Sequence, residues 1–413
     1  MGTYVSISIG SFDFLTSKNS FGGLLLPFSS KDLKIETAVD EDGEQYTRRY
    51  FSSTVSKLKL ILDSCGFTIE AAKQDFNVLK SEKLDFIQYC FEEDGDTFGM
   101  SYEDISVNFT FENWHQAALH YAKALSDGQR ELEQLSSDPP SIAEKIILDS
   151  LPYGEGFWGF ADVEFNIWSI FRAILDAFPS EQAVILDYTD LYNSGWCDEY
   201  PSEKDYEVPK TIILTEGKFD AEVISKSIDL LYPYMSKFYS FMNFSEYKVQ
   251  GSTNFLTHYL KAFAASGIQN PVIALYDNDS AGLAELMDLE RFHTPDNFRI
   301  MHLPDIDLAQ NYPTLGPNGK ESLNINGRAC SIELFLGTDV LSESGELIPV
   351  HWRGYNDKTK TYQGEIMQKG IVQSRFFDKC KAVEVSGEVP TEENKNWMEM
   401  RFLLHTLFNA FLR

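Results

Sequence analysis

The sequence has few cysteines and no arrangement of them that defines a site. The five cysteines lie far apart and form neither a C-x-x-C pair nor a Cys/His cluster. This pattern indicates neither a zinc site nor a disulfide framework, and it is typical of buried, reduced thiols. The seven histidines are also scattered, and none has the H-E-x-x-H spacing of a zinc protease helix.

Long apolar runs are absent as well. No segment approaches the roughly 20 apolar residues that a membrane-spanning helix needs. The first residues lack a basic stretch followed by an apolar run. We therefore expect a soluble, cytoplasmic protein with no membrane partner. A Walker A sequence is missing too, so an ATPase that works with this chain would be a separate partner.

Positive charge is scarce in the first half of the chain. The net charge is −28, of which −21 falls in residues 1–205, −7 in residues 206–340 and none in residues 341–413. Residues 351–381 differ, because basic and aromatic side chains alternate there. They are Arg353, Lys358, Lys360, Lys369, Arg375, Lys379 and Lys381, with Trp352, Tyr355, Tyr362, Phe376 and Phe377. This composition suits a surface that follows a phosphate backbone and stacks bases, but an ordinary amphipathic strand pair has it too.

The length of the chain indicates more than one domain. Single hydrophobic cores stop growing near ~250–300 residues, and this chain has 413. The polar segment "DEYPSEKDYEVPK" marks the main boundary. We expect an α+β, largely helical N-terminal domain (1–205), an α/β domain (206–340), and a C-terminal extension (341–413) with basic and aromatic strands. The apolar density of the final helix suggests packing or formation of a homo-oligomer.

Short apolar runs alternate with amphipathic helices from residue 211 onward. This alternation is typical of a parallel sheet whose faces are covered by helices. We expect strands at 212–214, 238–242, 271–276 and 298–303, and helices at 219–231, at 252–266 and from Ser280.

Two of these apolar runs end in acidic residues. "IILTEGKFD" contains Glu216 and Asp220, and "VIALYDNDSAG" contains Asp277 and Asp279. Functional groups in parallel sheets gather beyond the carboxyl ends of the strands, so neighbouring strands would bring these four carboxylates together. Close carboxylates raise one another's pKa, and Mg²⁺ or Mn²⁺ would relieve that repulsion.

The same positions also have structural explanations. Asp220 falls in the first turn of a helix, where an acid complements the helix dipole. Gly217 would let the chain turn sharply, or let a phosphate or metal approach the backbone. Gly282 would allow the helix to pack closely on the strand.

The two acidic segments resemble the signature motifs of the Toprim domain. "ILTEGKFDAEVI" is similar to E-G-x-x-D, and "ALYDNDSAG" to the D-x-D segment in its primase form. Primases, topoisomerases, recombination-mediator proteins and OLD-family nucleases share this domain. The resemblance, over roughly residues 208–340, implies a Toprim-type, mostly parallel sheet and a two-metal site. Asp277 and Asp279 would hold one ion, while Glu216 and Asp220 would hold the other or position the attacking water.

Two further positions follow from the resemblance to OLD-type nucleases. "GRACSIELFLG" places Glu333 where those enzymes have another metal ligand. "YQGEIMQKGIV" places Lys369 where they have a lysine that stabilises charge on the transferring phosphoryl group. The alternatives are that Glu333 is an exposed helix residue and that Lys369 has no role in catalysis.

The front of the chain resembles a HEPN/Toprim-associated N-terminal domain of bacterial defence proteins. The resemblance lies in "MGTYVSISIGSFDFLTSKN" and "YGEGFWGFADVEFNIWSIFRAILDAF", and it implies a helical module fused to a nuclease. The Arg/His pair of small helical ribonucleases is missing, so the resemblance does not imply ribonuclease activity for this part.

These observations favour one function and leave one alternative. The favoured function is a Mg²⁺- or Mn²⁺-dependent endonuclease that cleaves DNA or RNA in anti-phage defence. The alternative is a non-catalytic sensor subunit that binds nucleic acid or a partner protein. The cysteines supply no zinc module for a primase, and no tyrosine signature of a topoisomerase is evident.

Overall fold

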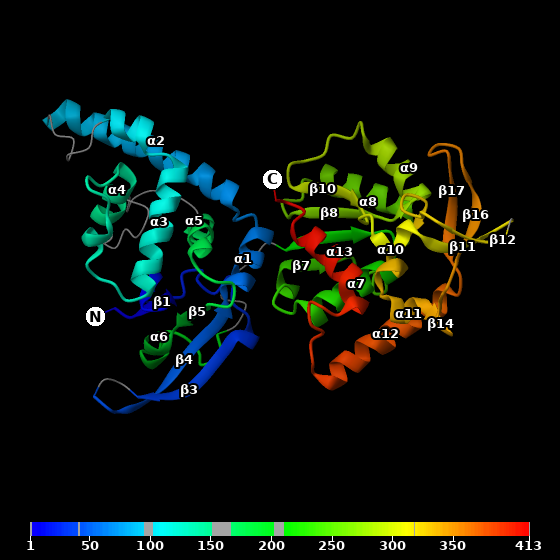
Figure 1. Cartoon of the computed structure of the whole chain (residues 1–413), viewed down its shortest axis with the longest axis horizontal. Helices are drawn as coiled ribbons and strands as arrows, with labels where there is room; N and C mark the ends of the chain where they lie inside the picture. Colours follow the sequence, from blue (N-terminus) through cyan, green and yellow to red (C-terminus); the bar gives the residue numbers. More distant parts are fainter. Residues whose placement is uncertain are drawn as a thin grey trace. The chain divides into compact units, whose positions relative to one another are not determined.

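The computed structural model describes residues 2–39, 42–94, 102–150, 167–201, 210–317 and 319–412. The chain forms two compact units, residues 1–207 with 412–413, and residues 208–411 (Figure 1). Residues 341–411, set apart in the sequence as an extension, belong to the same compact unit as residues 208–340. Most of the segment between the units, residues 202–209, lies outside the described residues.

The first unit contains an antiparallel sheet of five strands. Its order is β2-β1-β5-β4-β3, so β5, which is distant in sequence, pairs with both β1 and β4. The strands are β1 (Tyr4–Ile9), β2 (Phe12–Lys18), β3 (Leu33–Val39), β4 (Gln45–Thr54) and β5 (Ala183–Asp187). The helices are α1 (Val55–Ser64), α2 (Ile69–Asp94), α3 (Phe111–Ser126), α4 (Ile142–Ser150), α5 (Ile167–Ile174) and α6 (Thr189–Asn193).

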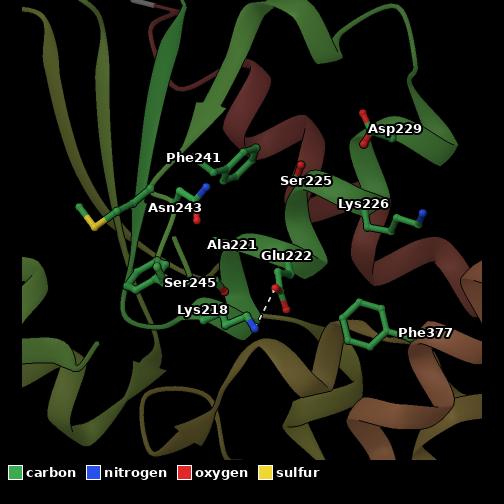
Figure 2. Close-up of a pocket in the computed structure, with 12 residues that line it drawn as sticks. Lys218, Ala221, Glu222, Ser225, Lys226, Asp229, Phe241, Asn243, Ser245 and Phe377 are labelled. Atoms are coloured by element: carbon green, nitrogen blue, oxygen red, sulfur yellow. Dashed lines mark ion pairs between the residues drawn. The ribbon is translucent and has the colours of Figure 1, made fainter. Parts of the chain in front are cut away.

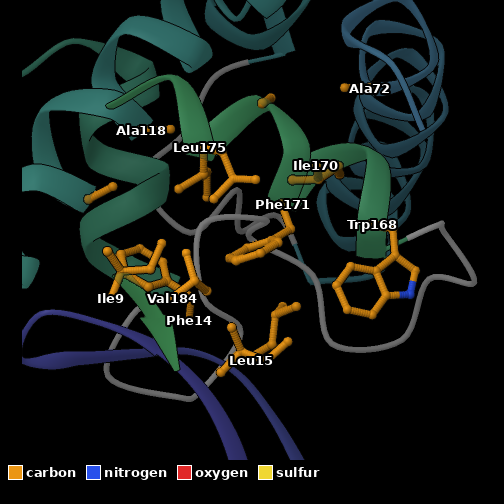
Figure 3. Packing of buried hydrophobic residues seen from close by; sticks show 14 of the residues in the cluster. Ile9, Phe14, Leu15, Ala72, Ala118, Trp168, Ile170, Phe171, Leu175 and Val184 are labelled. Carbon is orange, nitrogen blue, oxygen red and sulfur yellow. The ribbon is translucent and has the colours of Figure 1, made fainter. Parts of the chain in front are cut away.

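The core of this unit joins its sheet to its helices. Figure 3 shows Ile9, Phe14 and Val184 of the sheet together with Phe171 of α5. The rings of Phe14 and Phe171 are 6.4 Å apart, and Ile9, Phe171 and Val184 are completely buried. Burial of such side chains stabilises the unit by roughly 1.5–3 kcal/mol each. Residues 153–166, which carry part of the N-terminal resemblance, lie outside the described residues.

The second unit contains the predicted parallel sheet, which confirms the α/β fold class. Its order is β10-β8-β6-β7, and every neighbouring pair is parallel. The strands are β6 (Thr211–Thr215), β7 (Tyr239–Phe241), β8 (Val272–Tyr276) and β10 (Phe298–His302). The strands that precede the two acidic motifs are therefore direct neighbours, with Thr215 beside Leu275.

Helices cover both faces of the parallel sheet (Figure 1). One face packs against α8 (Thr253–Ala265) and α9 (Ser280–Leu289), where Leu256, Leu260 and Leu289 meet Val272 and Phe298. The other face is covered by α7 (Lys218–Leu231), next to which lie α12 (Lys369–Ser386) and α13 (Met398–Phe408).

A second sheet, also of four strands, has the order β12-β11-β16-β17. Its strands are β11 (Tyr312–Gly316), β12 (Gly319–Leu323), β16 (Val350–Asn356) and β17 (Thr361–Ile366). The shorter elements are β9 (Asn278–Asp279), α10 (Asp307–Gln310), β13 (Ala329–Cys330), η8 (Ile332–Phe335), α11 (Thr338–Leu341), β14 (Ser342–Glu343) and β15 (Glu346–Leu347). The basic and aromatic region 351–381 thus divides between the β16–β17 hairpin and α12.

The terminal helix α13 packs inside the second unit. Its buried residues include Met400, Leu404 and Phe408, and the helix lies against α7 and η8. This packing accounts for the buried apolar residues of α13, and Met398 and Phe402 remain exposed. No helix in the described ranges is both long enough and apolar enough to cross a membrane.

Candidate functional site

The two acidic motifs meet at the carboxyl ends of β6 and β8. Glu216 joins them, because its Oε1 accepts a hydrogen bond from the backbone N–H of Asp277 at 2.9 Å. Its Oε2 accepts the hydroxyl of Thr253 at 2.6 Å. Burial raises the pKa of Glu216, and these two hydrogen bonds oppose the rise. Glu216 therefore fixes the two strand ends relative to each other.

Asp277 lies at the centre of the negative charge. Burial raises its pKa well above the usual range, and neighbouring carboxylates raise it further. Those carboxylates belong to Asp220, Glu216, Asp279 and Glu333. Among the described residues, no side chain or backbone donor hydrogen-bonds to the Asp277 carboxylate. A cation bound here would remove both the repulsion and the lack of a partner.

Asp220 has the helix-start role that the sequence offered, and it also lies near other acids. In the first turn of α7, its Oδ2 accepts the backbone N–H of Gly217 at 2.9 Å, which stabilises the start of the helix. Burial and the charges of Glu333 and Glu216 nevertheless raise the pKa of Asp220 to about 7. The cap therefore holds the side chain in an unfavourable negative environment.

Both carboxylate oxygens of Asp279 accept hydrogen bonds. It precedes α9, and its Oδ1 accepts the backbone N–H groups of Ala281 and Gly282 at 2.9 and 2.8 Å. Its Oδ2 accepts the side-chain amide of Gln363. These contacts make Asp279 the N-cap of α9 and its link to the β16–β17 hairpin.

Two glycines near the motifs allow close packing of the backbone. A Cβ on Gly282 would lie 2.2 Å from the carbonyl oxygen of Asp277, so only glycine lets α9 start this close to the strand end. The chain bends at Gly217 as predicted, but the backbone there is extended, with φ of −150°, and does not require glycine. The close approach occurs instead at Gly251, where a Cβ would lie 2.7 Å from the carbonyl oxygen of Glu216.

Glu333 and Lys369 form an ion pair beside the acidic motifs. Glu333 lies in η8 and is completely buried, so the alternative of an exposed helix residue is wrong. Its Oε1 is 3.1 Å from Nζ of Lys369, the first residue of α12. Burial alone lowers the pKa of Lys369, but Glu333, Asp277 and Asp220 raise it above its ordinary value. The side chain of Lys369 is therefore positively charged at neutral pH and lies next to the acids.

Three supporting residues were not predicted from the sequence. Thr253 holds Glu216, Gln363 holds Asp279, and Gln373 donates to Oε1 of Glu333 at 2.9 Å. Thr253 and Gln363 are 37 and 84 residues from the acids they hold, so no local pattern could identify them. They are neutral donors, and they orient the acids without cancelling their charge.

The residues fit a divalent cation in chemical type and in charge. Carboxylate oxygens are the ligands that Mg²⁺ and Mn²⁺ prefer, and the acids here are close enough to raise one another's pKa. As their side chains stand, however, no group of three or more His, Cys, Asp or Glu residues in the described part of the chain is arranged to hold an ion. Binding would require rotation of these side chains.

A groove of about 540 Å³ lies against α7 beside the cluster (Figure 2). Lys218 lines it, two residues after Glu216, and its Nζ is 3.4 Å from Oε1 of Glu222. Phe377 of α12 and Asn243 also line the groove. Its lysines have acidic partners, since Lys226 pairs with Glu384, and it therefore adds little net positive charge to the site.

Comparison with known proteins concerns the first unit. The family model for HEPN/Toprim N-terminal domain 1 matches residues 1–210, about half of the chain. Neither the curated proteins nor the solved structures contain a match to this sequence.

Proposed function

This chain belongs to the HEPN/Toprim N-terminal domain 1 family, a nuclease-related family, and from that membership and the acidic cluster we propose that it is a metal-dependent endonuclease. It would hydrolyse phosphodiester bonds of nucleic acid, in bacterial anti-phage defence. One observation carries the proposal: two carboxylate motifs and a lysine converge at the carboxyl ends of neighbouring parallel strands. Active sites of open parallel sheets occupy this position.

The contacts suggest a distinct task for each residue. Asp220, Asp277 and Glu333 would hold Mg²⁺ or Mn²⁺, which stabilises the entering and leaving oxygens of a phosphoryl transfer when bound. Glu216, tied to the backbone of Asp277 and to Thr253, keeps the two motifs in register.

Lys369 and Asp279 have different tasks. The charged ammonium group of Lys369 lies beside the acids and can stabilise negative charge on the phosphoryl group. Asp279 caps α9 and anchors the hairpin that carries Gln363.

A second function is favoured by a different observation. Because no three potential ligands among the described residues are arranged to hold an ion as their side chains stand, the unit could bind nucleic acid without cutting it, as a sensor subunit. The two functions make different predictions for the purified protein. Incubation with plasmid DNA and with total RNA, in Mg²⁺, Mn²⁺ or EDTA, separates them. Cleavage that requires a metal supports the nuclease, whereas intact substrates in every condition favour the sensor.

Replacement of Lys369 by methionine should lower the rate of metal-dependent cleavage about a hundredfold, because a preorganised charge near the phosphoryl group is lost. The arginine variant should retain more activity, since it keeps the charge. Single-turnover cleavage rates measure the effect, and thermal unfolding checks that each variant is folded. Lys320→Met is the control, because Lys320 is exposed and its nearest acid, Glu346, is 3.6 Å away. Equal cleavage rates for Lys369→Met and Lys320→Met would show that Lys369 does not contribute to catalysis.

A further inference from the structure

The β12-β11-β16-β17 sheet of the second unit has an aromatic groove on one face. Tyr355 of β16 pairs with Tyr362 of β17, and Trp352 pairs with Gly364, so the three aromatic side chains point to the same side. Tyr355 and Tyr362 are 51% and 58% exposed, and their ring centroids are 5.2 Å apart. Large exposed aromatic residues grouped in this way mark a binding surface.

The floor of the aromatic groove fixes the indole of Trp352. A Cβ on Gly316 would lie 3.2 Å from Cδ1 of Trp352, and one on Gly364 would lie 3.0 Å from its Cε3. The indole therefore rests on two residues without side chains, one on a neighbouring strand on each side. A ring held in this way loses little freedom when a flat ligand stacks on it.

Two cations without acidic partners border the aromatic groove. Arg328 and Lys360 line this cavity of about 440 Å³, together with the three aromatic residues. Both side chains are exposed, and neither forms an ion pair with any residue that the structure describes. Glu321 is the acidic residue among the lining residues. On a chain with a net charge of −28, uncompensated cations beside exposed aromatic rings indicate a ligand with flat rings and negative charge.

The aromatic groove shares its framework with the second acidic motif. The carbonyl oxygen of Arg328 accepts the backbone N–H of Ser280 at 3.4 Å. The backbones of Arg328 and Asp279 also form an isolated β-bridge. Gln363, next to Tyr362, hydrogen-bonds to Asp279. A ligand in the groove would therefore be held by the residues that also position this motif.

We propose that the aromatic groove binds unpaired bases of single-stranded nucleic acid. The bases would stack on Tyr355, Tyr362 and Trp352, and the adjacent phosphates would contact Arg328 and Lys360. Duplex bases already stack on one another and are not free to stack on these rings. Single-stranded RNA and single-stranded DNA share this chemistry, and the test separates them. The inference that single-stranded nucleic acid is the substrate rests on the proposed nuclease function. Binding of a single strand to the groove is measured without cleavage.

The test uses full-length protein in EDTA and fluorescence anisotropy with labelled oligothymidine, oligouridine and a duplex, each of about 12 nucleotides. Tyr355→Ala/Tyr362→Ala should weaken binding of a single strand about a hundredfold, whereas the Phe/Phe double variant should stay within about twofold. Tyr247→Ala is the matched control, since Tyr247 is 73% exposed in the same unit. Arg328→Ala/Lys360→Ala should reduce the slope of log affinity against log salt concentration by about 1.4.

The outcomes separate this inference from the proposed function. Tight single-strand binding that the Ala/Ala variant loses supports the aromatic groove, even if the wild type cleaves nothing. If the wild type cleaves nucleic acid but the Ala/Ala and control proteins bind a single strand equally well, the proposed role of the groove is wrong. The proposed nuclease function then still stands. Absence of oligonucleotide binding, or equal affinity for duplex and single strand, also overturns it. A preference for oligouridine or oligothymidine shows which form the groove takes.

Discussion

Replacing Asp277 with asparagine should reduce metal-dependent cleavage about a thousandfold while the protein remains folded. Asp277 is the acid whose pKa is raised by all four neighbouring carboxylates, and asparagine keeps its shape while removing its charge. The loss follows because the amide binds Mg²⁺ or Mn²⁺ far more weakly than a carboxylate. Single-turnover cleavage of the preferred substrate, with saturating metal, measures the effect.

The control for this variant is Asp307→Asn. Asp307 is also in the second unit, but it is exposed at the start of α10 and accepts a hydrogen bond from Gln310. Its replacement should leave the rate within about twofold, as for most surface changes. Cleavage by Asp277→Asn at the wild-type rate would show that the acidic motifs do not form the active site.

Without metal, the protein should become less stable as the pH rises from about 4 to about 7. The pKa of Asp220 is about 7 in the folded chain, against an ordinary value of 3.8. Between these values the folded state holds a proton that the unfolded state has released, so stability present at low pH is lost as the pH rises. A difference of about 3 pKa units corresponds to roughly 4 kcal/mol, and Asp277 acts in the same direction.

Thermal unfolding in EDTA at several pH values measures this loss. Wild type and Asp220→Asn should differ most at neutral pH, where the variant is the more stable, and converge as the pH falls. Added Mg²⁺ should raise the midpoint of the wild type at neutral pH, because an ion that binds only the folded state stabilises it. Parallel pH profiles for the two proteins would contradict the proposed burial of charge.

The second unit was largely predictable because its local signals agree with its tertiary structure. Buried parallel strands are short continuous apolar runs, and the helices between them have one apolar face. The predicted strand 271–276 and helix 219–231 differ from β8 and α7 by one residue at one end. Because acidic residues follow two such runs, their position at the strand ends could also be predicted.

The contacts that assign tasks to the acids could not be predicted in the same way. Whether Asp279 keeps a free carboxylate depends on Gln363, which is 84 residues away. The sequence does offer a cap signal, since an Asp directly before a helix commonly serves as its N-cap. In the first unit, insertion of β5 between β1 and β4 depends on long-range pairing that strand propensity does not encode.

The central claim is that the acids at the ends of β6 and β8 hold a divalent cation, and Mn²⁺ binding tests it most directly. Calorimetric titration of the full-length wild type and Asp277→Asn with Mn²⁺, in the absence of nucleic acid, is the measurement. We expect that the wild type binds Mn²⁺, that Mg²⁺ competes, and that Asp277→Asn loses at least tenfold in affinity. Equal Mn²⁺ binding by the two proteins, or no binding by either, would contradict the central claim.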